Sequence, residues 1–341
     1  MLPFTLSVIQ NMLEKNQGDV MQKIGFGWAL VCTSAIFQPA HAEASALSGY
    51  EMLVTSASYG TGDHKNGVFR FDAVTGKYLG TFGSGAQITD PRGIRLTPQG
   101  DRVMVNNGDD RILMFNAKTG TFAGQLPLFK NLDPGGSKFG KDGRYYVGAR
   151  KSKSIVAFDL VKMSSPETFE HETYVKYPRG LAVTSAGKVY LASGTDPATG
   201  QGQNTILRFW PNGRLDETFK VDDPGLSPTD TEVGPNGDLF SGSERPFNDP
   251  SANTTVREYD ERTGALKQVF DAGYDVDGHR VTERPRGITF GPDGDLYSAG
   301  RNNIVRYRLS TGKFDKVVVS SPGINAQSII FIPKMPSARQ P

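Results

Sequence analysis

The chain has 341 residues, enough for one large all-β domain with a sizeable core. Its 40 glycines and 21 prolines, beside 37% hydrophobic residues, indicate many short strands between tight turns and exclude a helical bundle. The charge of +2 comes from 38 basic and 36 acidic residues, and no run of like charge could follow a phosphate backbone, which argues against nucleic acid as a partner.

Residues 21–42 have the pattern of a secretory signal peptide, and residues 1–20 are interpreted as a start-site extension. Lys23 supplies the positive charge at the start of the signal, and residues 24–37 form the apolar stretch. Ala40-His41-Ala42 matches a cleavage site. The apolar stretch is shorter than the roughly 20 residues that a bilayer requires, so we expect no membrane insertion. Cys32, the single cysteine, would be removed with it. We predict a periplasmic or secreted monomer with one domain at 43–341.

The predicted domain repeats a unit that opens with a proline, commonly followed by arginine and glycine. The copies are Pro91-Arg92-Gly93-Ile94, Pro134-Gly135-Gly136, Pro178-Arg179-Gly180-Leu181, Pro228-Thr229-Asp230 and Pro285-Arg286-Gly287-Ile288. A glycine turn and a second apolar strand follow each copy. The turn glycines are Gly100, Gly143, Gly187, Gly237 and Gly294. Their spacing is that of a propeller blade with loop insertions.

Each unit is expected to hold four antiparallel strands, because a third apolar strand such as Ser154–Phe158 and an outer strand such as Tyr78–Phe82 complete it. The first unit lacks its opening strand and starts at Met52–Thr55. Gln327–Phe331, in contrast, is an opening strand that is not followed by the other strands of a unit. Pairing these two segments makes one composite blade beside five complete ones. We therefore predict an all-β, six-bladed β-propeller closed by its N- and C-terminal strands.

The unit pattern resembles a known family. It consists of P-x-G-[IL], a turn such as Asp293-Gly294, a strand such as Asn303–Tyr307 and a turn such as Thr311-Gly312. This order is similar to the repeats of the six-bladed NHL-repeat propellers, in particular the streptogramin (virginiamycin B) lyase-like group. The resemblance covers essentially all of residues 43–341. It implies a lyase or hydrolase that acts on a cyclic ester or other small molecule at the central channel, with a divalent cation such as Mg²⁺ or Ca²⁺.

The opening strand of each blade faces the axis of a propeller, so equivalent positions should form one layer at the channel mouth. In this layer we place Arg92, Gly135, Arg179, Thr229, Arg286 and Gln327. Arginine binds carboxylate and phosphate through two parallel hydrogen bonds. We expect Arg92, Arg179 and Arg286, with Thr229 and Gln327, to bind an anionic or carbonyl-rich molecule. Alternatively, the arginines turn away and pair with loop carboxylates such as Asp90 or Glu283.

Three residues are candidates for catalysis. Asp230 is the acidic member of the next layer, a candidate general base or metal ligand, although it could instead cap a turn or neutralise Arg179 and Arg286. Glu244 ends a second strand, where the resemblance implies a glutamate. His279 follows Asp275 and Asp277 in an insertion, where two carboxylates could hold a cation and the histidine could act as a base; the alternative is a solvated turn.

Two other functions remain open. A calcium-dependent lactonase would use Glu51, Asn325 or Asn106, and Asp230. A non-catalytic propeller would bind a small molecule or a protein at its loop face, which the insertions at 195–204, 244–254 and 272–284 would enlarge. Tightly bound metal would favour either enzyme over the non-catalytic propeller.

Overall fold

Antiparallel strands account for nearly all regular structure in the computed structural model, which describes residues 45–57, 64–170, 174–196, 198–244, 254–282 and 284–335. The expected start-site extension and signal peptide lie outside these residues and stay predictions. Glu43–Pro341 forms one compact unit. Among the described residues, no helix is long and apolar enough to cross a membrane.

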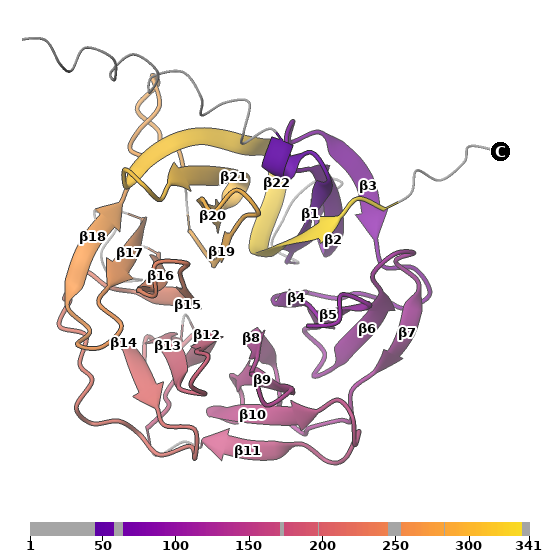
Figure 1. Ribbon diagram of the computed structural model, residues 1–341, viewed down its shortest axis with the longest axis vertical. Coiled ribbons are helices and arrows are strands. Elements are labelled where there is room, and N and C mark those ends of the chain that lie inside the picture. Colours follow the sequence, from indigo (N-terminus) through magenta and orange to yellow (C-terminus); the bar gives the residue numbers. More distant parts are fainter. Residues whose placement is uncertain are drawn as a thin grey trace, which may run out of the picture. The chain divides into compact units, whose positions relative to one another are not determined.

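Four separate sheets follow one another along the chain (Figure 1). The first contains β4 (Ile94–Leu96), β5 (Arg102–Asn106), β6 (Ile112–Asn116) and β7 (Phe122–Gln125). The second contains β8 (Pro134–Phe139), β9 (Arg144–Ala149), β10 (Ser154–Asp159) and β11 (Glu167–Glu170). The third contains β12 (Pro178–Val183), β13 (Val189–Thr195) and β14 (Gly202–Phe209). The fourth contains β15 (Pro228–Val233), β16 (Leu239–Ser243), β17 (Thr255–Tyr259) and β18 (Leu266–Phe270).

A fifth, 7-stranded sheet combines the two ends of the described chain. Its strands in spatial order are β19 (Gly287–Phe290), β20 (Leu296–Ala299), β21 (Arg301–Arg308), β22 (Lys313–Pro333), β1 (Tyr50–Ser56), β2 (Gly67–Asp72) and β3 (Tyr78–Phe82). The expected pairing of Gln327–Phe331 with Met52–Thr55 is present, with Met52 opposite Phe331 and Thr55 opposite Ser328. We expected separate outer and closing strands here, but β22 is continuous and pairs with both β21 and β1.

The third sheet has three strands instead of the expected four. After Asn212-Gly213, only Leu215 forms a bridge, with Phe209 of β14. The next residue ends the extended conformation, because the carboxylate of Asp216 accepts hydrogen bonds from the Thr218 amide at 3.1 Å and the Thr218 hydroxyl at 2.6 Å. Such a side-chain turn competes with strand pairing.

The hydrophobic core lies between neighbouring sheets. Met104 of β5 and Met114 of β6, for example, pack with Tyr145 of β9 and Phe158 of β10. Because neighbours cover both faces of a middle strand, β6 is apolar along nearly its whole length instead of alternating. At the turn after β6, Gly120 has φ of 69°, a conformation that favours glycine.

The innermost strands surround a common axis, visible at the centre of Figure 1. In the order β4, β8, β12, β15, β19 and β22, each contacts the next, and β22 also contacts β4. The proline of each repeat lies at or just before the start of its innermost strand. The residues after these prolines therefore gather at one end of the axis.

Candidate functional site

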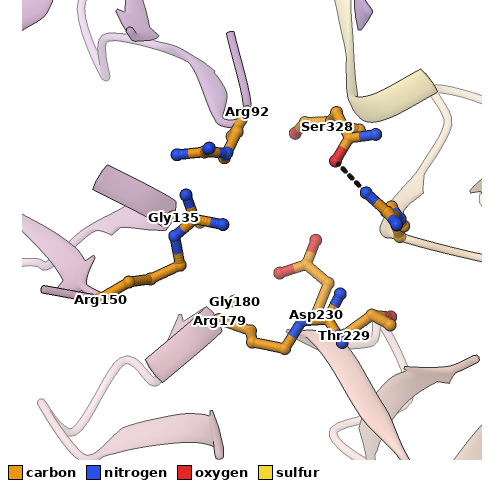
Figure 2. Close-up of a pocket in the computed structure, with 11 residues that line it drawn as sticks. Arg92, Gly135, Arg150, Arg179, Gly180, Thr229, Asp230 and Ser328 are labelled. Carbon is orange, nitrogen blue, oxygen red and sulfur yellow. Dashed lines mark hydrogen bonds between the residues drawn. The ribbon is translucent and has the colours of Figure 1, made fainter. Parts of the chain in front are cut away.

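The residues after the repeat prolines line a cavity of about 60 Å³ at this end of the axis (Figure 2). Its walls contain every position that we placed in one layer, namely Arg92, Gly135, Arg179, Thr229, Arg286 and Gln327, together with Gly136, Arg150, Gly180, Asp230 and Ser328. A water molecule occupies about 30 Å³ in the liquid, so the cavity fits a group the size of one carboxylate.

Arg179 and Arg286 share one carboxylate, that of Glu244. Arg179 Nη1 donates to Glu244 Oε1, and Arg286 Nε lies 3.5 Å from Oε2. Burial alone would raise the pKa of Glu244, but the two guanidinium groups hold this pKa below its usual value. The pKa of Arg286 is lowered, chiefly by burial and further by the charges of Arg179 and Arg284. An anion in the cavity would offset this loss of hydration.

Arg92 and Arg150 share a second carboxylate in the same way. Asp133 Oδ1 lies 2.5 Å from Arg92 Nη1 and 2.7 Å from Arg150 Nη2. Arg92 also pairs with Asp90 at 2.5 Å, as the alternative for this arginine predicted. Arg92 thus lines the cavity while its far side contacts loop carboxylates. Glu283 lies outside the described residues.

Asp230 projects into the cavity (Figure 2), and its carboxylate lies against Gly136 and Gly180. A Cβ atom on Gly180 would lie 1.9 Å from Asp230 Oδ1, so any larger residue at 180 would displace the carboxylate. The Thr231 amide donates to Oδ1 at 3.0 Å and the Ile288 amide to Oδ2 at 3.3 Å. Burial raises the pKa of Asp230 to about 6, against the opposing charge of Arg95.

This arrangement can perform two chemical tasks. The arginine wall can hold an anionic or strongly polar group by charge-assisted hydrogen bonds. Asp230 can exchange a proton near neutral pH, because its pKa of about 6 lies close to that range.

Thr229 and Gln327, which also line the cavity, have hydrogen-bond partners within the protein. The Thr229 hydroxyl donates to the Pro285 carbonyl at 2.5 Å, and Gln327 Nε2 donates to the Asn325 carbonyl at 2.9 Å.

His279 does not line this cavity. Its side chain is 79% exposed. The amides of Asp277 and His279 donate to Asp275 Oδ1 at 3.0 and 2.9 Å. The segment is thus the solvated turn that we gave as the alternative. Among the described residues, no group of three or more His, Cys, Asp or Glu is placed to hold a metal ion.

Of the residues named for a lactonase, Asp230 lines the cavity, whereas Glu51, Asn106 and Asn325 are not part of its lining. The Glu51 carboxylate pairs with Arg70 at 2.8 Å. Asn106 Nδ2 donates to the Gly135 carbonyl at 2.7 Å, and its Oδ1 accepts from the hydroxyl of Tyr145 at 2.9 Å. Asn106 thus stabilises the backbone behind the cavity wall through these hydrogen bonds.

Sequence reasoning missed Arg150 and Arg95. Arg150 and Glu244 hold the same repeat position, three residues after Val147 and Ser241, which pair with equivalent residues of the innermost strands. We considered this position for Glu244 but not for the repeat that carries Arg150. A register-based alignment of second strands would have found it. Arg95 lies within β4 beneath the cavity, where its Nη2 is 4.0 Å from Asp230 Oδ2.

Comparison with known proteins identifies the fold. No family model matches the chain, and no curated protein matches it. Solved structures do match. A chain of a nidogen/laminin complex has a TM-score of 0.61 at 12% identity, covering 83% of this chain and 98% of that one. Hydrazine synthase of Kuenenia stuttgartiensis has a TM-score of 0.56 at 14% identity, covering 79% and 90%.

Virginiamycin B lyase of Staphylococcus aureus is also similar, at 17% identity and a TM-score of 0.47, over 64% of this chain and 67% of that one. This likeness is too distant to carry a functional argument. Taken with the antiparallel sheets around one axis, the structural matches show that the chain has a β-propeller fold.

Proposed function

We propose that the protein binds a small anionic or carbonyl-rich molecule in the arginine-lined cavity of a closed, six-bladed propeller of the NHL type. One observation carries the ligand class. Arg92, Arg150, Arg179 and Arg286 come from four different repeats and line one cavity together with a single carboxylate, that of Asp230.

The six-bladed, closed architecture draws support from contacts between strands. Six innermost strands, from β4 to β22, follow one another around the axis, and β22 contacts β4. The pairing of β22 with β1 joins the two incomplete repeats. Such closure leaves no long unpaired edge.

The arginine wall retains capacity for a ligand. Glu244 serves both Arg179 and Arg286 and does not line the cavity, so this cluster keeps a net positive charge toward it, whereas Asp133 and Asp90 together balance Arg92 and Arg150. The Nε atom of Arg150 is buried and lacks a hydrogen-bond partner among the described residues. Unsatisfied buried donors are costly, so an anion that accepts from them gains affinity.

Ligand binding is tested with a panel of small carboxylates and phosphates, screened by thermal shift and measured by calorimetry. Arg179→Met and Arg286→Met should each weaken the best ligand about tenfold or more, because each removes a charge-assisted hydrogen bond. Arg111→Met is the control, since Arg111 pairs with Asp109 away from the cavity. Unaltered affinity in both variants, with reduced melting temperatures, would assign the arginines a structural role only.

A second candidate function is acid–base catalysis on a cyclic ester, as in a lyase or hydrolase. The supporting observation is the buried carboxyl of Asp230, whose pKa of about 6 suits a general base. A panel of lactones and cyclic depsipeptides tests it, with metal analysis of the purified protein alongside. Turnover that rises with pH through about 6 and is lost in Asp230→Asn would support catalysis. Turnover retained in Asp230→Asn would refute this role.

We also propose that the protein is a periplasmic or secreted monomer. The supporting pattern is the apolar stretch before Ala40-His41-Ala42. Mass spectrometry of exported protein should find an N-terminus at Glu43. Retention of Cys32 in the exported protein would contradict the proposal.

A further inference from the structure

A second cavity, of about 430 Å³, opens among the same innermost strands further along the axis. It is lined by Arg95 and Leu96 of β4, Lys138 and Phe139 of β8, Glu232 of β15, and residues of β19, β22 and β1. Arg95 follows Arg92 by three residues, so along an extended strand it lies about 10 Å from the arginine layer. The two cavities therefore occupy opposite ends of the axis.

Three aromatic side chains form part of the wall of this second cavity and are held in place from behind. Phe139, Phe290 and Phe331 line it. The ring of Phe139 lies 4.7 Å from that of Tyr145, and the ring of Phe331 lies 4.8 Å from that of Tyr297, centroid to centroid. Packed aromatic walls of this kind form a preshaped site for an apolar group.

Arg95, Lys138 and Glu232 are the charged residues that line the cavity. Lys138 pairs with Glu232, whereas the partner of Arg95 is Asp230, at 4.0 Å and outside the lining of this cavity. The Arg95 side chain is 8% exposed, and its Nη1 donates to the Ile94 carbonyl at 2.8 Å and to Ser328 Oγ at 3.1 Å. Its Nε and Nη2 have no hydrogen-bond partner among the described residues.

Arg95 and Asp230 together separate the two cavities. Arg95 lines the larger cavity and Asp230 the smaller one, with 4.0 Å between Nη2 and Oδ2. Asp230 is itself buried, and its hydrogen bonds come from backbone amides of β15 and β19. Arg95 therefore keeps two buried donors, Nε and Nη2, that have no hydrogen-bond partner in the described part of the chain and lie beside the larger cavity.

We propose that this larger cavity is a second binding site, which takes a small amphipathic monocarboxylate with its carboxylate at Arg95 and Lys138 and its apolar part against Phe139, Phe290 and Phe331. The volume fits a chain or ring of moderate size. The three aromatic side chains disfavour a compact, fully hydrated anion such as phosphate, which distinguishes this site from the arginine-lined cavity. The proposal does not depend on what the arginine-lined cavity binds.

The test uses octanoate as the probe and 1-octanol as its neutral counterpart, titrated calorimetrically into the intact mature chain. Octanoate should bind saturably and more tightly than octanol. Arg95→Met should weaken octanoate about tenfold or more, through the lost charge-assisted hydrogen bond, and should leave octanol nearly unchanged. Arg102→Met is the matched control, because Arg102 lies on the adjacent strand with its side chain 47% exposed.

A second variant keeps the test decisive if Arg95→Met fails to fold. Thr289 lines the cavity and is partly exposed, so Thr289→Glu places a negative charge in the wall without removing a core group. It should weaken octanoate and spare octanol. Absence of octanoate binding at millimolar concentration, equal affinity for octanol, or octanoate affinity unaltered by both variants would each overturn the proposal.

Discussion

Asp230 and Glu244 are buried carboxyls in opposite electrostatic environments. Glu244 contacts Arg179 and Arg286 directly, which favours its ionised form. Asp230 has one guanidinium, that of Arg95, at 4.0 Å, and burial dominates its titration. The two residues therefore respond to pH with opposite signs.

Asp230→Asn should change stability in a pH-dependent way. The folded pKa of Asp230 is about 6, above the ordinary 3.8, so the folded protein binds the proton more tightly and loses stability as pH rises between these values. A shift of about two units corresponds to roughly 3 kcal/mol. The variant lacks this loss, so its free energy of unfolding relative to wild type should be higher at pH 7.5 than at pH 4, measured by denaturant titration. An equal difference at both pH values would contradict the burial argument.

Glu244→Gln should show the reverse trend. Because the folded pKa of Glu244 is depressed below 4.5, its stabilisation is present above that value and is lost as pH falls through the folded pKa. Removing the shared carboxylate leaves Arg179 and Arg286 facing each other, which should cost about 3–5 kcal/mol at pH 7. The difference from wild type should shrink on acidification. Glu217→Gln, at an exposed position, serves as the control, and a similar loss there would count against the prediction.

At the scale of elements, β22 belongs to two parts of one sheet with different burial. Its first part, which pairs with β21, is exposed at Val317. Its second part pairs with β1 and buries Ile329 against Met52 and Val54. The strand thus changes from an outer edge to an innermost element along its length.

Ile329→Ala should therefore destabilise the whole propeller by about 2–5 kcal/mol, the usual range for a buried isoleucine. Val317→Ala on the same strand should change the free energy of unfolding by less than about 0.5 kcal/mol, because its side chain is 39% exposed. Thermal unfolding of both variants provides the comparison. Local fraying in Ile329→Ala without a shift of the main transition would argue against an integral role for this strand.

At the scale of the whole molecule, the prolines and glycines of the repeats were the best predictors of the fold. Proline and glycine act locally, so they marked the innermost strands and the layer containing Arg92, Arg179 and Arg286. The missing outer strand after β14 was not predictable from periodicity, because an Asp216–Thr218 side-chain turn prevents it.

The pairing of charges around the cavity could not be predicted from the sequence either. Asp133 joins Arg92 to Arg150 across two repeats, and Glu244 joins Arg179 to Arg286. Such pairs depend on strand register and on the distance between neighbouring sheets, which a repeat pattern does not specify. The sequence therefore predicted which positions meet but not how their charges are balanced.

The partnership of β22 with β1 also has a consequence for the order of folding. The hydroxyl of Thr55 donates to the carbonyl of Ser328, across 273 positions of the chain at 3.4 Å. During synthesis β1 emerges early, while the strand that covers its free edge emerges after every other strand of the described chain. For that interval, unpaired amides and carbonyls and the apolar face of β1 are open to other chains, which is a hazard for aggregation. Completion of the propeller is therefore expected to be a late and slow step, governed by loop closure over nearly its whole length.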